Sequence, residues 1–210
     1  MKNIFSEMER KQGLKNMKFV CKFITAIIIC LFLCSCWLPE KFTATLNIDK
    51  NKNYKFSYEG TIVFIPALEE ITIKGRLTSD VESMMKEAEG LFKKEPGFKS
   101  FKYLGNGRYQ VYYESSGAIQ NGKKIFLDLI QFQIDKNGQI IILGPKITSK
   151  EQNKLQSIGY KLDGILKLTT KLKVVKHNAI STPKLWGLIG AYEWRITLKE
   201  PVQPMIVLQP

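Results

Sequence analysis

Two neighbouring stretches of the chain alternate between apolar and polar residues. The first runs from Phe42 to Ile48 and the second from Tyr54 to Phe64. A period of two is typical of a β-strand that buries one face and exposes the other to water. Residues 49–53 have turn composition, so the pattern predicts a β-hairpin. Pro66 is expected to end its second strand, and Glu69-Glu70 to begin a solvated loop.

A different period marks residues 79–94. Apolar residues from Val81 to Phe92 recur there every three or four positions, which predicts a helix with one buried stripe. Pro96-Gly97 is expected to end this helix. A second, short helix is predicted over residues 149–158, ended by Gly159.

Further alternating stretches complete a set of about nine predicted strands. Together with the two helices they predict an α+β fold in which most of the sheet is antiparallel. The strands are expected over residues 42–48, 54–64, 98–104, 108–114, 125–134, 139–143, 160–176, 191–198 and 205–208.

The first part of the chain has the features of an export leader. Lys15, Lys18 and Lys22 precede an apolar core over residues 23–33. This core is about eleven residues long, which suits a signal peptide. It falls short of the roughly 20 residues that a spanning helix needs. The residues before Met17 are polar and charged, which favours Met17 as the true start.

The apolar core ends in Leu33-Cys34-Ser35-Cys36, which resembles the lipobox of bacterial lipoproteins. In that family an aliphatic residue and two small residues precede a cysteine whose thiol receives a diacylglycerol. The leader is cut just before this cysteine, and the new amino terminus is often acylated. The resemblance implies that residues 1–35 are a lipoprotein signal peptide and that Cys36 carries the lipid. Cys34 departs from the usual Ala, Ser, Thr or Val but is similarly small.

Such processing would explain why all four cysteines lie in the first 36 residues. Cys21, Cys30 and Cys34 would leave with the leader, and Cys36 would become a thioether. The mature domain would then hold no disulfide and no cysteine-bound metal. Two or more acyl chains anchor a protein stably on a bilayer. The alternative is an ordinary secretory leader, or a single-span anchor, that happens to be rich in cysteine.

Residues 36–210 are expected to form a single domain with a sizeable core. The chain has a formal charge of +13, and the leader carries six basic and two acidic residues, which leaves +9 for the mature part. This charge favours anionic partners. Anionic lipid or an envelope polymer suits an exported protein better than nucleic acid does. An AT-rich genome is an equal explanation, because 28 of the 32 basic residues are lysine.

A row of lysines is the main candidate for a binding surface. Lys167, Lys171 and Lys173 alternate with apolar residues in a predicted strand. Such a row could face anionic headgroups, at about 1 kcal/mol per lysine near the surface. The alternative is that these lysines only deter edge-to-edge strand pairing. The segment from Trp186 to Trp194, with Trp194 in its final strand, is a second docking candidate.

Candidate catalytic residues are few. His177 is the only histidine, and no metal, phosphate-loop or nucleophile motif accompanies it. His177 and Asn178 are therefore expected to bond loop backbone. Asp128 is expected on the apolar side of its strand, where a lysine partner or an edge position would accommodate it. The sequence thus predicts no enzyme, no cofactor and no metal site.

The mature part resembles a group of small, uncharacterised bacterial lipoproteins. The opening from Cys36 to Phe42 (CWLPEKF) and the pattern from Tyr54 to Thr61 carry the resemblance. Later elements of that group appear as His177-Asn178-Ala179 and Tyr192-Glu193-Trp194. The plan also resembles the mycobacterial LppM-type lipoprotein domain, which is implicated in lipid binding.

The leading hypothesis is therefore a non-enzymatic, lipid-anchored envelope protein that binds a lipid, an envelope polymer or a protein partner. A concave apolar sheet under the helix 79–94 could hold an acyl chain. The alternatives are an assembly subunit of an envelope complex and, third, an envelope hydrolase using His177 or Asp128. Trp37 follows Cys36 where enterobacterial lipoproteins of the inner membrane carry Asp. This resemblance implies a periplasm-facing protein of the outer membrane.

Overall fold

Two β-sheets make up most of the computed structural model, which describes residues 37–184, 189–199 and 202–210. The first sheet contains β1 (Trp37–Ile48), β2 (Asn53–Phe64), β3 (Phe98–Gly105), β4 (Arg108–Ala118), β8 (Asp163–Thr170) and β10 (Tyr192–Thr197). The second contains β5 (Lys124–Ile125), β6 (Ile130–Ile134), β7 (Ile140–Leu143), β9 (Lys173–His177) and β11 (Met205–Gln209).

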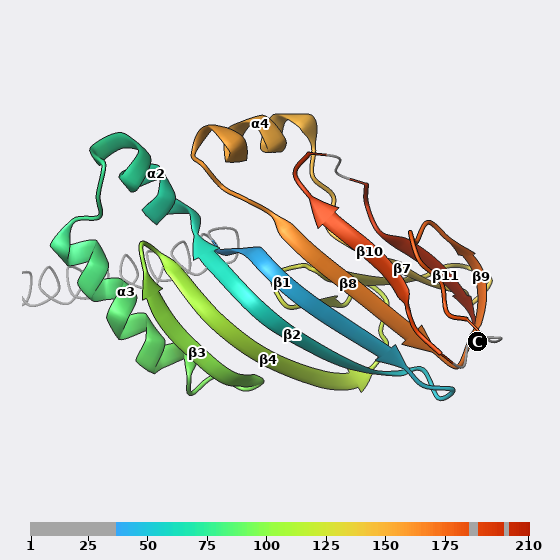
Figure 1. Cartoon of the computed structure of the whole chain (residues 1–210). Helices are drawn as coiled ribbons and strands as arrows, with labels where there is room; N and C mark the ends of the chain where they lie inside the picture. Colours follow the sequence, from blue (N-terminus) through green and yellow to red (C-terminus); the bar gives the residue numbers. More distant parts are fainter. Residues whose placement is uncertain (1–36, 185–188, 200–201) are drawn as a thin grey trace, which may run out of the picture. The chain divides into compact units, whose positions relative to one another are not determined.

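The strand order is β10-β8-β1-β2-β4-β3 in the first sheet and β5-β6-β7-β11-β9 in the second. Every strand pair is antiparallel except β1 with β8, and Figure 1 shows these two lying side by side with their arrows in the same direction. The predicted α+β class with mostly antiparallel sheet is confirmed.

The β1–β2 hairpin follows its alternating pattern closely. Phe42 pairs across the sheet with Gly60, and Ile48 pairs with Tyr54. The apolar set buries one side of the sheet, here called the inner face, while Thr43, Asn47 and their neighbours remain on the outer face. One packed and one solvated face is the arrangement that alternation predicts.

Aromatic rings join the second sheet to the inner face of the first. Tyr54 of β2 packs against Phe132 of β6, with ring centroids 5.4 Å apart. Phe126 lies 4.4 Å from Tyr58 and 4.6 Å from Tyr113. Rings at these distances contribute about 0.5–1.5 kcal/mol per pair beyond the burial of their area.

Three helices lie in the described part of the chain, at α2 (Ile65–Lys74), α3 (Ser79–Phe92) and α4 (Ser149–Ser157). The helices predicted over residues 79–94 and 149–158 are confirmed. They end two residues and one residue earlier than predicted. A capping box between Thr148 and Glu151 begins α4. None of the helices described is long and apolar enough to cross a bilayer.

The space between α3 and the sheet is filled by rings. Trp37 lies 5.8 Å from Phe92, 6.4 Å from Phe101 and 5.1 Å from Tyr109, measured between centroids. The Tyr109 hydroxyl also donates a 2.5 Å hydrogen bond to the Met85 carbonyl of α3. Because aromatic side chains occupy this space, the structure does not support the acyl-chain site that was expected under the helix.

Helix α2 was not predicted from the sequence, because Pro66 was expected to end the strand and Glu69-Glu70 to begin a loop. Pro66 instead lies in the first helical turn, where its missing N–H removes no intrahelical bond. Glu70 forms an ion pair with Lys74 one turn later, at 2.8 Å. Gly75, with a φ of 75°, ends the helix.

Two predicted strands are each divided, which raises the count from nine to eleven. Residues 125–134 are interrupted by a turn in which Phe126, Leu127 and Asp128 have positive φ. Residues 160–176 divide near Lys171, whose N–H donates to the carbonyl of Ile48. Each half then pairs in a different sheet, β8 with β1 and β9 with β11.

Candidate functional site

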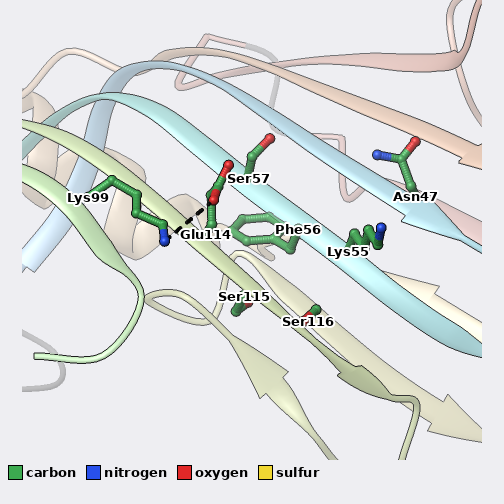
Figure 2. A pocket seen from close by; sticks show the side chains of 8 residues that line it. All are labelled: Asn47, Lys55, Phe56, Ser57, Lys99, Glu114, Ser115 and Ser116. Carbon is green, nitrogen blue, oxygen red and sulfur yellow. Dashed lines mark ion pairs between the residues drawn. The ribbon is translucent and has the colours of Figure 1, made fainter.

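A polar hollow of about 430 Å³ lies against β1, β2 and β4. Figure 2 shows its lining, with Lys99 and Glu114 joined by an ion pair whose closest atoms are 3.8 Å apart. The strands place these groups because outward positions of the alternating pattern carry polar side chains. The lining residues are Asn47, Lys55, Phe56, Ser57, Lys99, Glu114, Ser115 and Ser116.

A second hollow, of about 720 Å³, continues from the first and shares Asn47, Lys55 and Ser116 with it. Its other walls come from the β1–β2 turn and from the end of β8, including Thr169 and Lys171. Lysine ammonium groups, hydroxyls and amides therefore line one continuous surface. This set of groups suits an anionic, oxygen-rich ligand.

Asp49, the acid that lines the second hollow, is hydrogen-bonded within the β1–β2 turn. The backbone N–H of Asn53 donates to Asp49 at 2.9 Å and lowers the pKa of that carboxyl, with help from the Asn53 side chain, the Asn51 N–H and Lys171. Because the pKa is lowered on folding, the turn gains stability at neutral pH. This gain is lost as the pH falls through the lowered pKa.

The predicted lysine row does not form one surface. Lys167 lies on β8 and pairs with Glu193 at 3.4 Å. Lys171 lies in the turn after β8 and lines the second hollow, while Lys173 begins β9 in the other sheet. The row is lost because the predicted strand divides between two sheets, and binding at these lysines stays a prediction.

Trp194 is a core residue, with 3% of its surface exposed. Its indole N–H donates to the side-chain oxygen of Asn178 at 2.8 Å. The same oxygen accepts from the backbone N–H of Met205, also at 2.8 Å. Asn178 thereby links β10 of the first sheet to β11 of the second. Binding through Trp194 is disfavoured by this burial, and residues 186–188 of the second docking candidate lie outside the described residues.

His177 and Asn178 bond loop backbone, as predicted. His177 Nδ1 accepts from the Ala179 N–H at 3.2 Å, and the Asn178 amide donates to the Gln203 carbonyl at 2.8 Å. The His177 ring packs edge-on to Tyr192 at 4.9 Å. The two later elements of the resemblance to small lipoproteins thus meet in space, and the described contacts give them a structural role.

Replacing Asn178 by Ala is expected to cost about 2 kcal/mol of unfolding free energy, because the buried Trp194 N–H loses its acceptor. Replacing the exposed His177 by Ala is expected to change stability by less than about 0.5 kcal/mol. Urea unfolding monitored by tryptophan fluorescence measures both. Equal losses in the two variants would contradict the linking role of Asn178.

Asp128 is not on an apolar face, so that prediction is wrong. The left-handed turn carries it out of the strand pattern, and its carboxylate pairs with Lys124 at 2.6 Å, both side chains being exposed. The expectation of a lysine partner is confirmed. Among the described residues, no cluster of three or more His, Cys, Asp or Glu side chains could hold a metal.

The three residues that both hollows share, Asn47, Lys55 and Ser116, are among those that the sequence did not identify as candidates. Alternation places Lys55 on the solvated face, but nothing local brings it close to Lys171. That proximity depends on the parallel pairing of β1 with β8. Cys36 lies outside the described residues, and Trp37, the next residue, begins β1.

No protein-family model and no curated protein matches the chain. Among solved structures, the chain is similar to the folded domain of LppM from Mycobacterium tuberculosis, determined by NMR. The similarity covers 81% of this chain and 89% of that domain, with 11% identical residues and a TM-score of 0.37. LppM is also the type of domain that the sequence resembles, but a likeness at this TM-score carries no argument about what the chain binds.

Proposed function

We propose that the chain is a lipid-anchored protein of the bacterial cell envelope, whose domain binds a partner and catalyses no reaction. The anchor is Cys36, and the domain faces the periplasm, from the outer membrane in preference to the inner. One observation carries the proposal. Trp37, directly after the lipobox cysteine, is already in β1 and only 6% exposed.

The burial of Trp37 means that the fold begins where the proposed leader ends. A cut before Cys36 would remove residues 1–35 without removing any residue of the two sheets. Consecutive Cα atoms are about 3.8 Å apart, so the lipid would attach within one residue of the aromatic cluster around Trp37. The anchor would then hold the domain close to the membrane without a flexible linker.

A binding role is supported by the side chains that line the hollows. They offer cations, amides and hydroxyls, whereas His177, at the end of β9, and Asp128, in the turn before β6, lie apart and have local partners. An assembly subunit of an envelope complex is the second candidate, in which the outer face would contact a protein. Crosslinking in intact cells that captures one protein stoichiometrically would favour that alternative.

Detergent phase separation of host-cell extracts tests the anchor. The full chain is expected in the detergent-rich phase, because two or three acyl chains dominate its partition at about 0.8 kcal/mol per buried CH₂. Recovery of the mature chain in the aqueous phase would contradict the proposal. An exported soluble protein of the same extract serves as the control for the aqueous phase.

A further inference from the structure

Three turns meet at the end of the first sheet where β1 ends. The Lys171 N–H donates to the Ile48 carbonyl at 3.1 Å, and the Ile119 N–H donates to the Lys52 carbonyl at 3.0 Å. Lys123 lies over the Tyr54 ring, with its Nζ 4.9 Å from the ring centroid. The turns bring together a set of lysines, here called the lysine edge: Lys50, Lys52, Lys55, Lys123 and Lys171.

The lysine edge has little compensating charge. None of its five members belongs to an ion pair found in the described residues. Asp49, between Ile48 and Lys50, is the nearest acid in sequence, and its one negative charge, which interacts with Lys171, offsets one of the five lysines. Elsewhere acids are paired with lysines, as at Glu70, Glu82 and Glu89. This edge is therefore a local excess of positive charge.

The second hollow gives the lysine edge a shape as well as a charge. Lys55 and Lys171 line it together with Asn47, whose side-chain oxygen accepts from the Thr169 hydroxyl and whose amide N–H groups make no hydrogen bond among the described residues. Ammonium groups bind phosphate as point charges, while amides and hydroxyls can bond neutral oxygens. A polymer in which phosphates alternate with oxygen-bearing linkers fits this combination of groups.

We propose that the lysine edge binds a soluble phosphate-bearing polymer of the envelope. This inference rests on the proposed function, because it names the partner of the anchored domain. Phosphates of the polymer would contact Lys55 and Lys171 in the hollow. Neighbouring phosphates of the same polymer would lie near Lys50, Lys52 and Lys123. Binding of this kind releases counterions and weakens with salt.

The position of the lysine edge favours a polymer over the membrane that holds the anchor. Strand β1 runs from Trp37, next to the proposed anchor, to Ile48, at the lysine edge. Its register is irregular between Pro39 and Phe42, and Figure 1 shows the β1 ribbon bending near its start and then running straight to its end. At about 3.3 Å per residue it is on the order of 35 Å long. The Debye length is about 8 Å at physiological salt, so a domain standing on its anchor presents its lysines to the space beyond the bilayer.

Calorimetric titration of the full chain in nonionic detergent with short inorganic polyphosphate tests the proposal. The double variant Lys55→Gln/Lys171→Gln is expected to bind about tenfold more weakly. The slope of log K against log salt should fall by roughly 1.5, because two phosphate contacts are lost. The matched control, Lys146→Gln/Lys150→Gln, removes two exposed lysines, one before α4 and one in its first turn, that form no ion pair in the described residues. This variant is expected to bind as the unchanged chain does.

Two outcomes would overturn the proposal. Equal weakening in both double variants would mean that only net charge matters. Absence of polyphosphate binding, with Lys55- and Lys171-dependent binding to phosphatidylcholine vesicles containing phosphatidylglycerol, would assign the lysines to a membrane surface instead. Because the titration is done in detergent, its result does not depend on the anchor. Failure of the polymer site and failure of the anchor are thus separate results.

Discussion

A Cys36→Ser variant is expected to lose its incorporation of labelled palmitate completely and to migrate on gels as a longer chain that retains its leader. A serine hydroxyl cannot form the thioether, and in lipoproteins the cut before the cysteine follows its modification. The effect is all or none because a single sulfur atom is proposed to carry the attachment. Metabolic labelling followed by gel electrophoresis measures both changes.

The matched control is Cys34→Ser, two residues earlier. Serine at this position agrees better with the lipobox pattern than cysteine does, so labelling and mobility should be unchanged. Loss of the label from the Cys34 variant alone would move the anchor to Cys34. Absence of label from the unchanged chain would contradict the proposed lipid anchor.

A Gly60→Ala variant is expected to lose about 3 kcal/mol of unfolding free energy, because the added methyl group overpacks the contact between two strands. An added Cβ would lie 2.5 Å from the Phe42 Cα and closer still to the Lys41 carbonyl oxygen. These are backbone atoms of β1, next to the irregular register between Pro39 and Phe42, and they cannot move aside as a flexible side chain can. The melting temperature should fall by roughly 6–12 °C.

Gly90→Ala makes the same chemical change where nothing lies within 4 Å of the added atom. Gly90 is inside α3, so alanine should stabilise the helix by about 0.5–1 kcal/mol. Thermal unfolding followed by circular dichroism compares the two variants. Opposite signs are expected, and a stable Gly60→Ala protein would mean that β1 and β2 approach each other less closely than described.

The fold class and most strand positions could be predicted because alternation depends only on which face is buried. The hairpin from Phe42 to Ile62 shows this, since its apolar positions are the buried ones. The break near Lys171 could not be predicted, because the apolar alternation continues across it. Only the choice of partners, β1 for one half and β11 for the other, divides the segment.

Pro66 illustrates a different limit. Proline ends a strand and also begins a helix, and the residues that decide between these outcomes come after it. The candidate site depended even more on tertiary structure. Lys171 was identified from the sequence, but its neighbour in the hollow, Lys55, comes from a strand more than 100 residues earlier. No local pattern connects the two.

The central claim is that the chain is tethered through Cys36, directly beside the first buried residue of its fold. Mass spectrometry of the amino-terminal peptide of the mature protein, isolated from its native cell, tests this claim most directly. The account predicts a peptide that begins at Cys36 and carries a diacylglyceryl group on the sulfur. A mature chain that retains peptides from residues 1–35, or whose Cys36 sulfur is unmodified, would contradict it.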